Sequence, residues 1–220
     1  MIKLSKRLQT IADLVDKCNV FSDIGCDHAL LDIYLIQNKK IKKAIACDIT
    51  KGAINQANIN INKYGVKNIE TRLGDGLTVI DKNDKINTIV FSGLGGSKIT
   101  DILKKEESKI TFDTIIVQAN NGIYLVRKYL TSIGYYIYNE KIVKDNNIIY
   151  VVIKFKKGNK KYSKKELLYG TSYIKDNDLY KEYINNIINK NKYIINKIPN
   201  KLFIKKVILK IRNKKLSKYI

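Results

Sequence analysis

Residues 20–28 read Val-Phe-Ser-Asp-Ile-Gly-Cys-Asp-His, and this stretch decides the fold. A short apolar run ends in an aspartate, a glycine and a second aspartate, and a helix-like segment begins at about residue 28. In α/β proteins a nucleotide pocket opens where a strand ends, the backbone turns tightly and a helix begins. An ordinary strand-to-helix turn has the same local pattern, so the interpretation depends on the residues at the later strand ends.

Asp27 indicates the charge of the ligand. The glycine-rich form G-x-G-x-x-G suits a pyrophosphate, but Asp27 stands where a dinucleotide site often has glycine, and its carboxylate would repel phosphate. A positively charged ligand without phosphates fits better, and S-adenosylmethionine is such a ligand. An NAD-dependent oxidoreductase is disfavoured for the same reason.

Apolar runs and helical segments alternate over the first 132 residues. Strands are expected at 19–24, 43–48, 68–73, 86–91 and 113–118. Helices are expected at 4–17, before the first strand, and then at about 28–38, 50–64, 96–106 and 121–132. This alternation indicates right-handed crossovers and a mainly parallel sheet.

The pattern changes after residue 134. Residues 135–143 and 147–156 are both strand-like, and the Lys-Asp-Asn-Asn segment at 144–147 predicts a hairpin turn. Five strand–helix units closed by a hairpin are typical of class I methyltransferases, whereas a dinucleotide dehydrogenase more often continues with a parallel unit. The sequence therefore predicts an α/β, Rossmann-like class I methyltransferase sheet, mainly parallel with a terminal antiparallel hairpin.

Beyond a linker at 157–160 the sequence predicts a separate helical region. Apolar residues recur at helical spacing from Leu179 to Ile198, Pro199 interrupts the pattern, and it resumes as far as Ile211. We expect two antiparallel helices, with a shorter one at 163–174, that form a C-terminal α-helical coiled-coil arm. The predicted domains are therefore 1–158, which binds the cofactor, and 159–220, a basic helical domain.

Positive charge is concentrated in this arm. The chain has 42 Lys and Arg against 20 Asp and Glu, a formal net charge of +22. Residues 151–220 hold 20 basic and 4 acidic residues, whereas residues 1–150 hold 22 and 16, an asymmetry that an even codon bias toward lysine would not produce. The arm is the expected site of a polyanion contact. A packing arm with solvated lysines and a basic helix on a membrane surface are the alternatives.

The composition also indicates the compartment. No apolar run approaches the ~18 residues of a membrane span, and the N-terminus lacks the apolar core of a signal peptide. Cys18, Cys26 and Cys47 have no C-x-x-C spacing, so buried thiols are expected rather than a metal site. We expect a cytoplasmic protein with no membrane contact, no metal and no obligate protein partner, most simply a monomer.

The end of the first strand supplies carboxylates and a glycine. Ligands of open α/β sheets bind beyond the carboxyl ends of the strands. Asp23 and Asp27 would take the methionine ammonium of S-adenosylmethionine, and Gly25 would let the backbone pass close to it. His28, the single histidine, is either a contact of the same ligand or a helix-start residue bonded to backbone.

The end of the second strand supplies Asp48, 25 positions after Asp23. A carboxylate at this place accepts hydrogen bonds from both ribose hydroxyls. The alternative is that Asp48 caps the helix that begins at about residue 50. We include Asp48 and the adjacent Ile49 in the predicted cofactor site.

The remaining strand ends add glycines and amides. Asp75, followed by Gly76, would accept a hydrogen bond from the adenine amino group of the cofactor, although a plain turn has the same pattern. Gly93 begins a run of three glycines in four residues, where a planar base or the transferring methyl group could approach the backbone. Gln118 and Asn120 are suited to reading the edge of a nucleobase, with a helix N-cap as the alternative for Asn120.

Five segments together carry a resemblance. They are L-S-K-R-L at 4–8, D-I-G-C-D-H-A at 23–29, R-L-G-D-G-L at 72–77, S-G-L-G-G at 92–96 and Q-A-N at 118–120. Over most of residues 4–156 the chain resembles the bacterial tRNA (adenine-22-N1)-methyltransferase family, and its arm resembles that family's coiled-coil C-terminal domain in layout. The family more often has A-G-M-G-G and Q-P-N, so Ser92, Leu94 and Ala119 depart from its pattern.

The resemblance implies methyl transfer from S-adenosylmethionine to N1 of adenine 22 in the D-arm of tRNA. N1 has a free lone pair and the sulfonium is a strong methyl donor, so in-line positioning supplies much of the rate and no strong base is obligatory. N1 lies on the Watson–Crick edge, so the base must leave its stack and its pair. Gln118 and Asn120 would hold the base beside the glycine run, and Asp23 or Asp27 would offset the charge of the methylated product.

Two other classes of function stay open on the residues alone. One is a methyltransferase that acts on rRNA or DNA; a small-molecule substrate is disfavoured by the basic arm. The other is a non-catalytic RNA-binding protein on a methyltransferase fold, which the joint presence of Asp23, Gly25, Asp48 and Asp75 disfavours.

Overall fold

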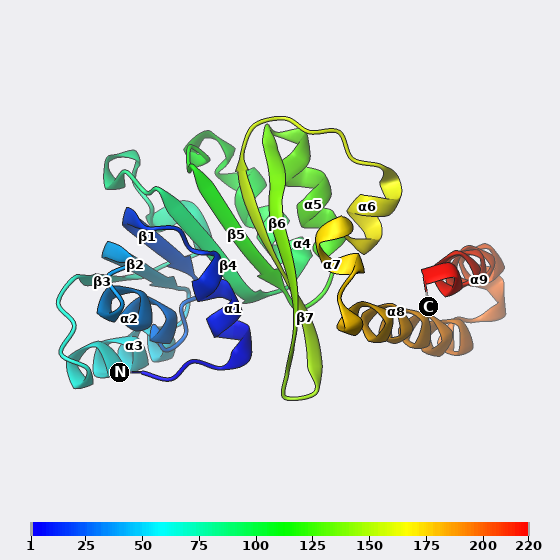
Figure 1. Ribbon diagram of the computed structural model, residues 1–220, viewed down its shortest axis with the longest axis horizontal. Helices are drawn as coiled ribbons and strands as arrows, with labels where there is room; N and C mark the ends of the chain where they lie inside the picture. Colours follow the sequence, from blue (N-terminus) through cyan, green and yellow to red (C-terminus); the bar gives the residue numbers. More distant parts are fainter. Residues whose placement is uncertain (1, 220) are drawn as a thin grey trace. The chain divides into compact units, whose positions relative to one another are not determined.

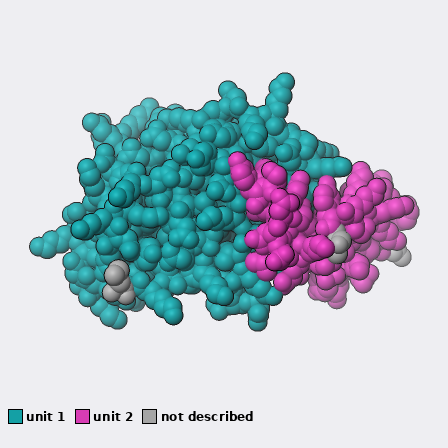
Figure 2. Space-filling model, in the orientation of Figure 1, with its two compact units in different colours: residues 1–170 teal, residues 171–220 magenta. Residues whose placement is uncertain are grey.

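The computed structural model describes residues 2–219, and their contacts divide the chain into two compact units, Met1–Gly170 and Thr171–Ile220 (Figure 2). The first unit is built on a β-sheet and the second is helical. Within the described residues, no helix combines the length and the apolar character needed to cross a membrane.

The first unit contains a seven-stranded sheet in the order β3-β2-β1-β4-β5-β7-β6 (Figure 1). The strands are β1 (Cys18–Ile24), β2 (Ile41–Asp48), β3 (Ile69–Leu73), β4 (Thr88–Leu94), β5 (Thr114–Ala119), β6 (Tyr135–Asp145) and β7 (Ile148–Lys157). The first five pair in parallel, and β7 enters antiparallel between β5 and β6. The predicted class I methyltransferase sheet is confirmed.

The helices of this unit follow the expected alternation. They are α1 (Lys6–Leu14), α2 (Leu30–Gln37), α3 (Lys51–Lys63), α4 (Gly96–Lys105), α5 (Ile123–Ser132) and α6 (Lys164–Tyr169), with short 3-10 turns at Gly76–Val79, Lys82–Asp84 and Glu107–Lys109. Right-handed crossovers place α2 and α3 on one face of the sheet and α4 and α5 on the other (Figure 1). The direction of winding reverses between β1 and β4, and a ligand site is expected at this switch point.

The core explains why the central strands read as continuous apolar runs. All six residues of β5 are buried, as are the first five of β4, because both faces of a parallel sheet are covered by helices. Phe21 of β1, Val90 of β4 and Ile116 of β5 belong to the same buried cluster as Ile11 of α1 and Leu35 of α2.

Helix α1 is shorter than the predicted 4–17 and has a defined start. The Ser5 side chain accepts a hydrogen bond from the Leu8 N–H, which is N-cap geometry, and Val15 ends the helix in extended backbone. Lys40 Nζ donates to the Ala12 and Val15 carbonyls at the other end, at 2.7 and 3.2 Å. Both ends are thus held, so the first turn, which carries Arg7, is fixed against the sheet.

The contacts place α6 in the first unit. Arg127, fully buried in α5, donates to Glu140 Oε1 at 2.7 Å and to the Leu167 carbonyl of α6 at 3.2 Å. By contacts the unit therefore ends after Gly170, whereas the functional division that we expect begins at residue 159. The predicted single helix at 163–174 is wrong, because Gly170, at φ 107°, separates α6 from the next helix.

The second unit is a helical hairpin preceded by one short helix. Its elements are α7 (Ser172–Lys175), α8 (Asp178–Lys197), α9 (Phe203–Leu216) and 3-10 turns at Asn200–Leu202 and Ser217–Tyr219. Helices α8 and α9 run antiparallel, since Asn191 Nδ2 donates to Asn213 Oδ1 at 2.8 Å and Tyr180 stacks edge-on with Tyr219 (Figure 1). The buried residues of α8 are Tyr180, Ile184, Ile188 and Asn191. The first three each come one position after an apolar residue of the predicted helical pattern that starts at Leu179, and those predicted residues lie beside the buried face.

Candidate cofactor and substrate site

A cavity of about 310 Å³ lies at the carboxyl ends of β1, β2 and β4, at the switch point of the sheet. It is lined by Arg7, Leu8, Asp23, Gly25, Cys26, Asp27, His28, Leu30, Leu31, Asp48, Thr50, Ala53, Ser92, Gly93 and Leu94. Three carboxylates and one guanidinium thus face one space. Among residues 2–219 no group of three histidine, cysteine or acidic side chains could hold a metal ion.

The turn after β1 is tied to the end of β2. The N–H groups of Gly25 and Cys26 both donate to the Cys47 carbonyl, at 2.8 and 3.0 Å. Gly25 has φ +82°, and Asp27 and Ala29 have φ values of 51° and 52°, which are costly for residues with a side chain. This strained path explains the glycine at position 25 and brings both predicted carboxylates of the turn to the cavity.

Asp23 is a buried carboxylate with an unused acceptor. The residue is 4% exposed, and its Oδ1 accepts no hydrogen bond within the described residues. Burial raises the pKa of Asp23 to about 7, an effect that Arg7 opposes and that Asp48 and Asp27 reinforce. An unpaired buried acceptor is unfavourable, so this oxygen is suited to a cationic donor supplied by a ligand.

Asp48 lies at the end of β2 with part of its acceptor capacity in use. Its Oδ1 accepts from the N–H and the hydroxyl of Thr50, each at 2.9 Å, and its Oδ2 accepts from the Asp27 N–H at 3.3 Å. The N-cap of α3 is Thr50, whose hydroxyl accepts from the Ala53 N–H. The alternative that Asp48 itself caps this helix is therefore wrong.

Two more predicted cofactor residues are His28 and Ile49, and only His28 lines the cavity. His28 lines the cavity, and its Nε2 lies 3.4 Å from Asp27 Oδ2. Ile49 is 60% exposed and is not among the residues that line the cavity.

The structure does not bring Asp75 and Gly76 into this cavity. Asp75 Oδ1 pairs with Lys98 Nζ at 3.0 Å, and the residue lines a separate cavity of about 80 Å³. Gly76 has φ +62°, and a Cβ at this position would lie 2.6 Å from a methyl group of Ile102, so packing alone requires glycine there.

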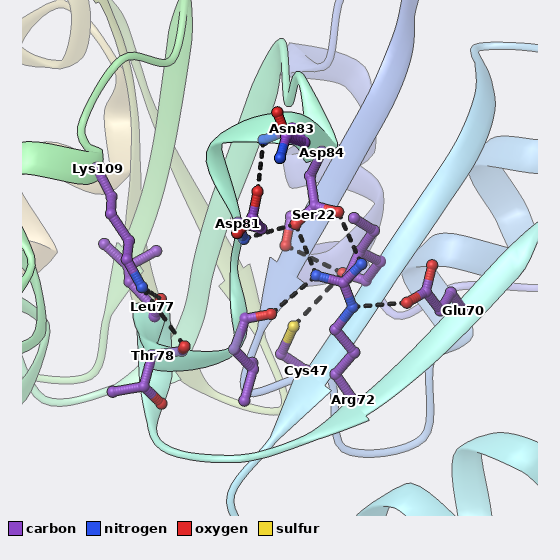
Figure 3. Close-up of polar contacts among 12 residues, drawn as sticks. Ser22, Cys47, Glu70, Arg72, Leu77, Thr78, Asp81, Asn83, Asp84 and Lys109 are labelled. Atoms are coloured by element: carbon purple, nitrogen blue, oxygen red, sulfur yellow. Dashed lines mark hydrogen bonds and ion pairs between the residues drawn. The ribbon is translucent and has the colours of Figure 1, made fainter.

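Arg72 holds the segment after β3 (Figure 3). It donates to both carboxylate oxygens of Asp84, at 2.6 and 2.7 Å, and to the Val79 carbonyl at 2.8 Å. Its Nε donates to Glu70 Oε1 at 2.6 Å. The arginine of the R-L-G-D-G-L segment therefore positions the loop that carries Asp75.

The wall formed by β4 and β5 is a closed hydrogen-bond network. The completely buried Gln118 accepts at Oε1 from Arg7 Nη1 (2.7 Å), the Gly93 N–H (3.1 Å) and the Ser92 hydroxyl (3.3 Å). Gln118 Nε2 donates to Asn120 Oδ1 at 3.0 Å, and Asn120 Nδ2 donates to the Gly93 carbonyl at 2.6 Å. Gln118 thus supports the wall and reaches no solvent, whereas Asn120 is exposed beside Gly93.

Comparison with known proteins identifies the family. The sequence profile of a methyltransferase domain matches residues 4–153. The structure of M. capricolum TrmK with S-adenosyl-homocysteine is 33% identical, covers 98% of this chain and 97% of that chain, and superposes with a TM-score of 0.86. The chain belongs to the TrmK family of class I methyltransferases.

The B. subtilis enzyme, matched once by sequence and once by structure, supports the same family. The tRNA (adenine(22)-N(1))-methyltransferase of Bacillus subtilis is 37% identical over 154 residues, which are 69% of this chain and 64% of that enzyme, slightly less than two thirds of its length. The crystal structure of the B. subtilis M1A22 tRNA methyltransferase TrmK is 28% identical, with full coverage of both chains and a TM-score of 0.89.

Arg7 is a residue of the TrmK-family site that the sequence reasoning missed. Its Nη1 donates to the Ser92 hydroxyl at 2.8 Å and to Gln118, while its Nε and Nη2 donate to no described residue. The signal was present in L-S-K-R-L, but the prediction of a helix at 4–17 gave Arg7 no role in the site. With Asp23 it gives the cavity one cation and one anion.

Asp32 of α2 was also missed. It is fully buried, neither of its carboxylate oxygens has a hydrogen-bond partner among the described residues, and burial with the nearby Asp23 raises its pKa well above the ordinary value. An acid in the otherwise apolar segment L-L-D-I-Y-L-I was the signal. Burial thus disfavours the ionised form of Asp32, which does not line the cavity.

Proposed function

We propose that this chain transfers the methyl group of S-adenosylmethionine to N1 of adenine 22 of tRNA. The observation that carries the proposal is the joint placement of Asp23, Arg7 and Asp48 around one cavity at the switch point of a TrmK-family fold. The B. subtilis M1A22 tRNA methyltransferase structure shares this fold over the whole chain, and the B. subtilis tRNA (adenine(22)-N(1))-methyltransferase sequence matches 69% of the chain.

The residues present fit the cofactor. The unpaired Asp23 Oδ1 would accept from the methionine ammonium, and the guanidinium of Arg7 would donate to the methionine carboxylate. The remaining acceptor capacity of Asp48 suits the ribose hydroxyls. Asp75 stays a prediction for the adenine end, where it would have to release Lys98. When bound, the sulfonium supplies the methyl group.

The chain's own residues then have to place the target base. Gly93 has φ +77° and carries no side chain, so a planar base can approach the end of β4, and the exposed Asn120 lies beside it. Since N1 attacks with a free lone pair, the wall needs no base, and Gln118 serves by holding Asn120, Ser92 and Arg7 in position. Asp23 would offset the positive charge of the N1-methylated product.

The arm, residues 159–220, is proposed to supply most of the non-specific affinity for tRNA. It carries the excess of lysine, and phosphate contacts of this kind release counterions, so binding should weaken steeply with salt. Deleting residues 171–220 should leave cofactor affinity and greatly reduce tRNA affinity, because this cut keeps α6, whose Leu167 carbonyl accepts from the buried Arg127, on the first unit. We further propose that the protein acts in the cytoplasm as a monomer, without an obligate protein partner.

The test is incubation with labelled S-adenosylmethionine and unmodified tRNA, and then mapping of the modified nucleoside. Label in 1-methyladenosine at position 22 supports the proposal. Cofactor binding without methylated tRNA would redirect the search to rRNA or DNA. The Asp48→Ala variant tests the cofactor site separately from tRNA binding. It should weaken cofactor binding about tenfold, because roughly one good hydrogen bond to a charged group is lost, and it should leave tRNA binding intact.

A further inference from the structure

The β6–β7 hairpin projects beyond the edge of the sheet that holds the cavity. Gln118, next to the end of β5, pairs with Val152 of β7, yet β7 begins four residues earlier, at Ile148. At about 3.3 Å per residue the tip reaches roughly 13 Å past that level. Figure 1 shows the two strands continuing together past the end of β5 to a narrow turn.

The tip of this hairpin is a tight turn. Asn146 and Asn147 have φ values of 47° and 61°, the conformation of a tight two-residue turn whose twist matches that of the strands. Asp145 and Ile148 are directly paired on either side of the turn. A side chain on this tip therefore has a defined place relative to the sheet.

Arg7 links the hairpin tip to the cavity. Its backbone N–H donates to Asp145 Oδ2 at 3.1 Å, and its guanidinium carbon lies 5.7 Å from the ring centre of Tyr150 on β7. The same guanidinium donates to Gln118 in the cavity wall. Ile148, the cross-strand partner of Asp145, therefore lies on the part of the hairpin that contacts Arg7, one of the residues that line the cavity.

Ile148 is 54% exposed although it is β-branched and apolar. An open groove of about 560 Å³ lies beside the hairpin, lined by Val143 of β6 and by Lys3 and Lys6 of the N-terminal segment, among others. The exposed isoleucine at the tip and the two lysines of the groove beside the hairpin combine a group that avoids water with groups that bind phosphate. This combination is the one by which proteins insert a side chain into a nucleic-acid stack.

We propose that Ile148 is a wedge residue that fills the gap left in the tRNA stack when the target adenine turns out toward the cavity, while Lys3 and Lys6 contact the adjoining phosphates. This inference rests on the proposed function. Turning out a base costs a few kcal/mol of stacking and pairing, and an apolar side chain placed in the gap offsets part of that cost. Only a side chain with a defined place relative to the sheet can occupy the gap and leave the base free to react.

The test uses the full chain and a tRNA with 2-aminopurine in place of adenine 22, whose fluorescence rises when the base leaves its stack. The variant is Ile148→Ala, and the matched control is Ile59→Ala, which removes an equally exposed isoleucine (57%) from α3. The wild-type chain and the control should raise the fluorescence, and Ile148→Ala should lose most of the rise. Its single-turnover methylation of ordinary tRNA should fall about tenfold at unchanged cofactor affinity.

A second substrate separates a wedge from a merely structural role. With a tRNA in which base 22 is left unpaired by changing its partner, the defect of Ile148→Ala should shrink to less than about threefold, because less opening has to be stabilised. Equal behaviour of Ile148→Ala and Ile59→Ala on paired tRNA would overturn the wedge while leaving the proposed function intact. A wild-type chain that neither unstacks nor methylates base 22 would overturn both.

Discussion

The two walls of the cavity differ in how far their polar groups are satisfied. On the β4–β5 wall, Gln118 accepts three hydrogen bonds and donates one to Asn120, which in turn donates to the Gly93 carbonyl. On the β1 wall, Asp23 leaves Oδ1 without a hydrogen bond among the described residues, and Asp32 behind it leaves both oxygens so. The polar groups of the first wall are paired with one another, whereas the second leaves acidic oxygens without hydrogen-bond partners among the described residues.

This difference indicates which wall of the cavity binds the ligand. Buried acceptors without partners destabilise a fold, and natural proteins retain them mainly where function needs them. A satisfied network instead stabilises the fold and fixes geometry. Substitutions on the two walls should therefore have opposite signs for stability, even where both impair methyl transfer.

The largest effect is expected for Asp23→Asn, which keeps the shape and removes the charge. Affinity for S-adenosylmethionine should fall about 100-fold, because a buried charge-assisted hydrogen bond to the ammonium is lost. The free energy of unfolding of the free protein should rise, since an unpaired buried carboxylate is gone. Calorimetric titration and urea unfolding measure the two quantities.

Asp13→Asn is the control for Asp23→Asn, because Asp13 is exposed on α1 and lines neither the cavity nor the smaller cavity of Asp75. It should change neither quantity measurably. A fall in stability for Asp23→Asn would contradict the assignment of the β1 wall as the strained one.

On the opposite wall, Gln118→Ala should destabilise the free protein by about 1–3 kcal/mol. It leaves Arg7 Nη1, the Gly93 N–H and Asn120 Oδ1 without their shared partner. The rate of methyl transfer should fall with them, because the seat of the base loses its support. Urea unfolding measures the stability and single-turnover kinetics measure the rate of methyl transfer. The matched control is Gln56→Ala, which removes one long hydrogen bond to Asn60 on α3. A Gln118→Ala chain as stable as this control would contradict a supporting role.

The same contrast marks what the sequence could predict. The sequence of strands and helices along the chain, the hairpin and the strand-end positions of Asp23, Asp48 and Gly93 follow from periodicity and turn residues, and the structure agrees with them. Arg7 was not predicted as a site residue because it lies on a helix and not at a strand end, and its long side chain reaches across to β4 and β5. That Gln118 is buried depends on β7 covering β5, a tertiary relation that no local pattern contains.

A third prediction concerns the carboxyl behind the β1 wall. Asp32→Leu should raise the free energy of unfolding by about 1–3 kcal/mol, because it replaces a fully buried, unpaired acid with an apolar side chain of similar size. Methyl transfer at neutral pH should change less than about threefold, because Asp32 does not line the cavity. Thermal unfolding and the labelled-methyl assay measure this, and a large loss of activity at raised stability would show that the acid serves the cavity.

The pH dependence of cofactor binding gives the smallest effect and tests the comparison without a mutation. Burial raises the pKa of Asp23 to about 7, so the free folded protein keeps a proton there that the unfolded chain releases at about pH 4. The folded state binds more protons over this interval, so this residue's contribution to stability falls as the pH rises from about 4 to 7. The cofactor ammonium requires the ionised carboxylate, so affinity should move the other way and rise about tenfold from pH 5.5 to 7. Asp23→Asn should remove that rise, and titrations of both proteins at the two pH values decide it. If the wild-type affinity were the same at both values, Asp23 would already be ionised in the free protein, and the two walls would differ in geometry but not in charge.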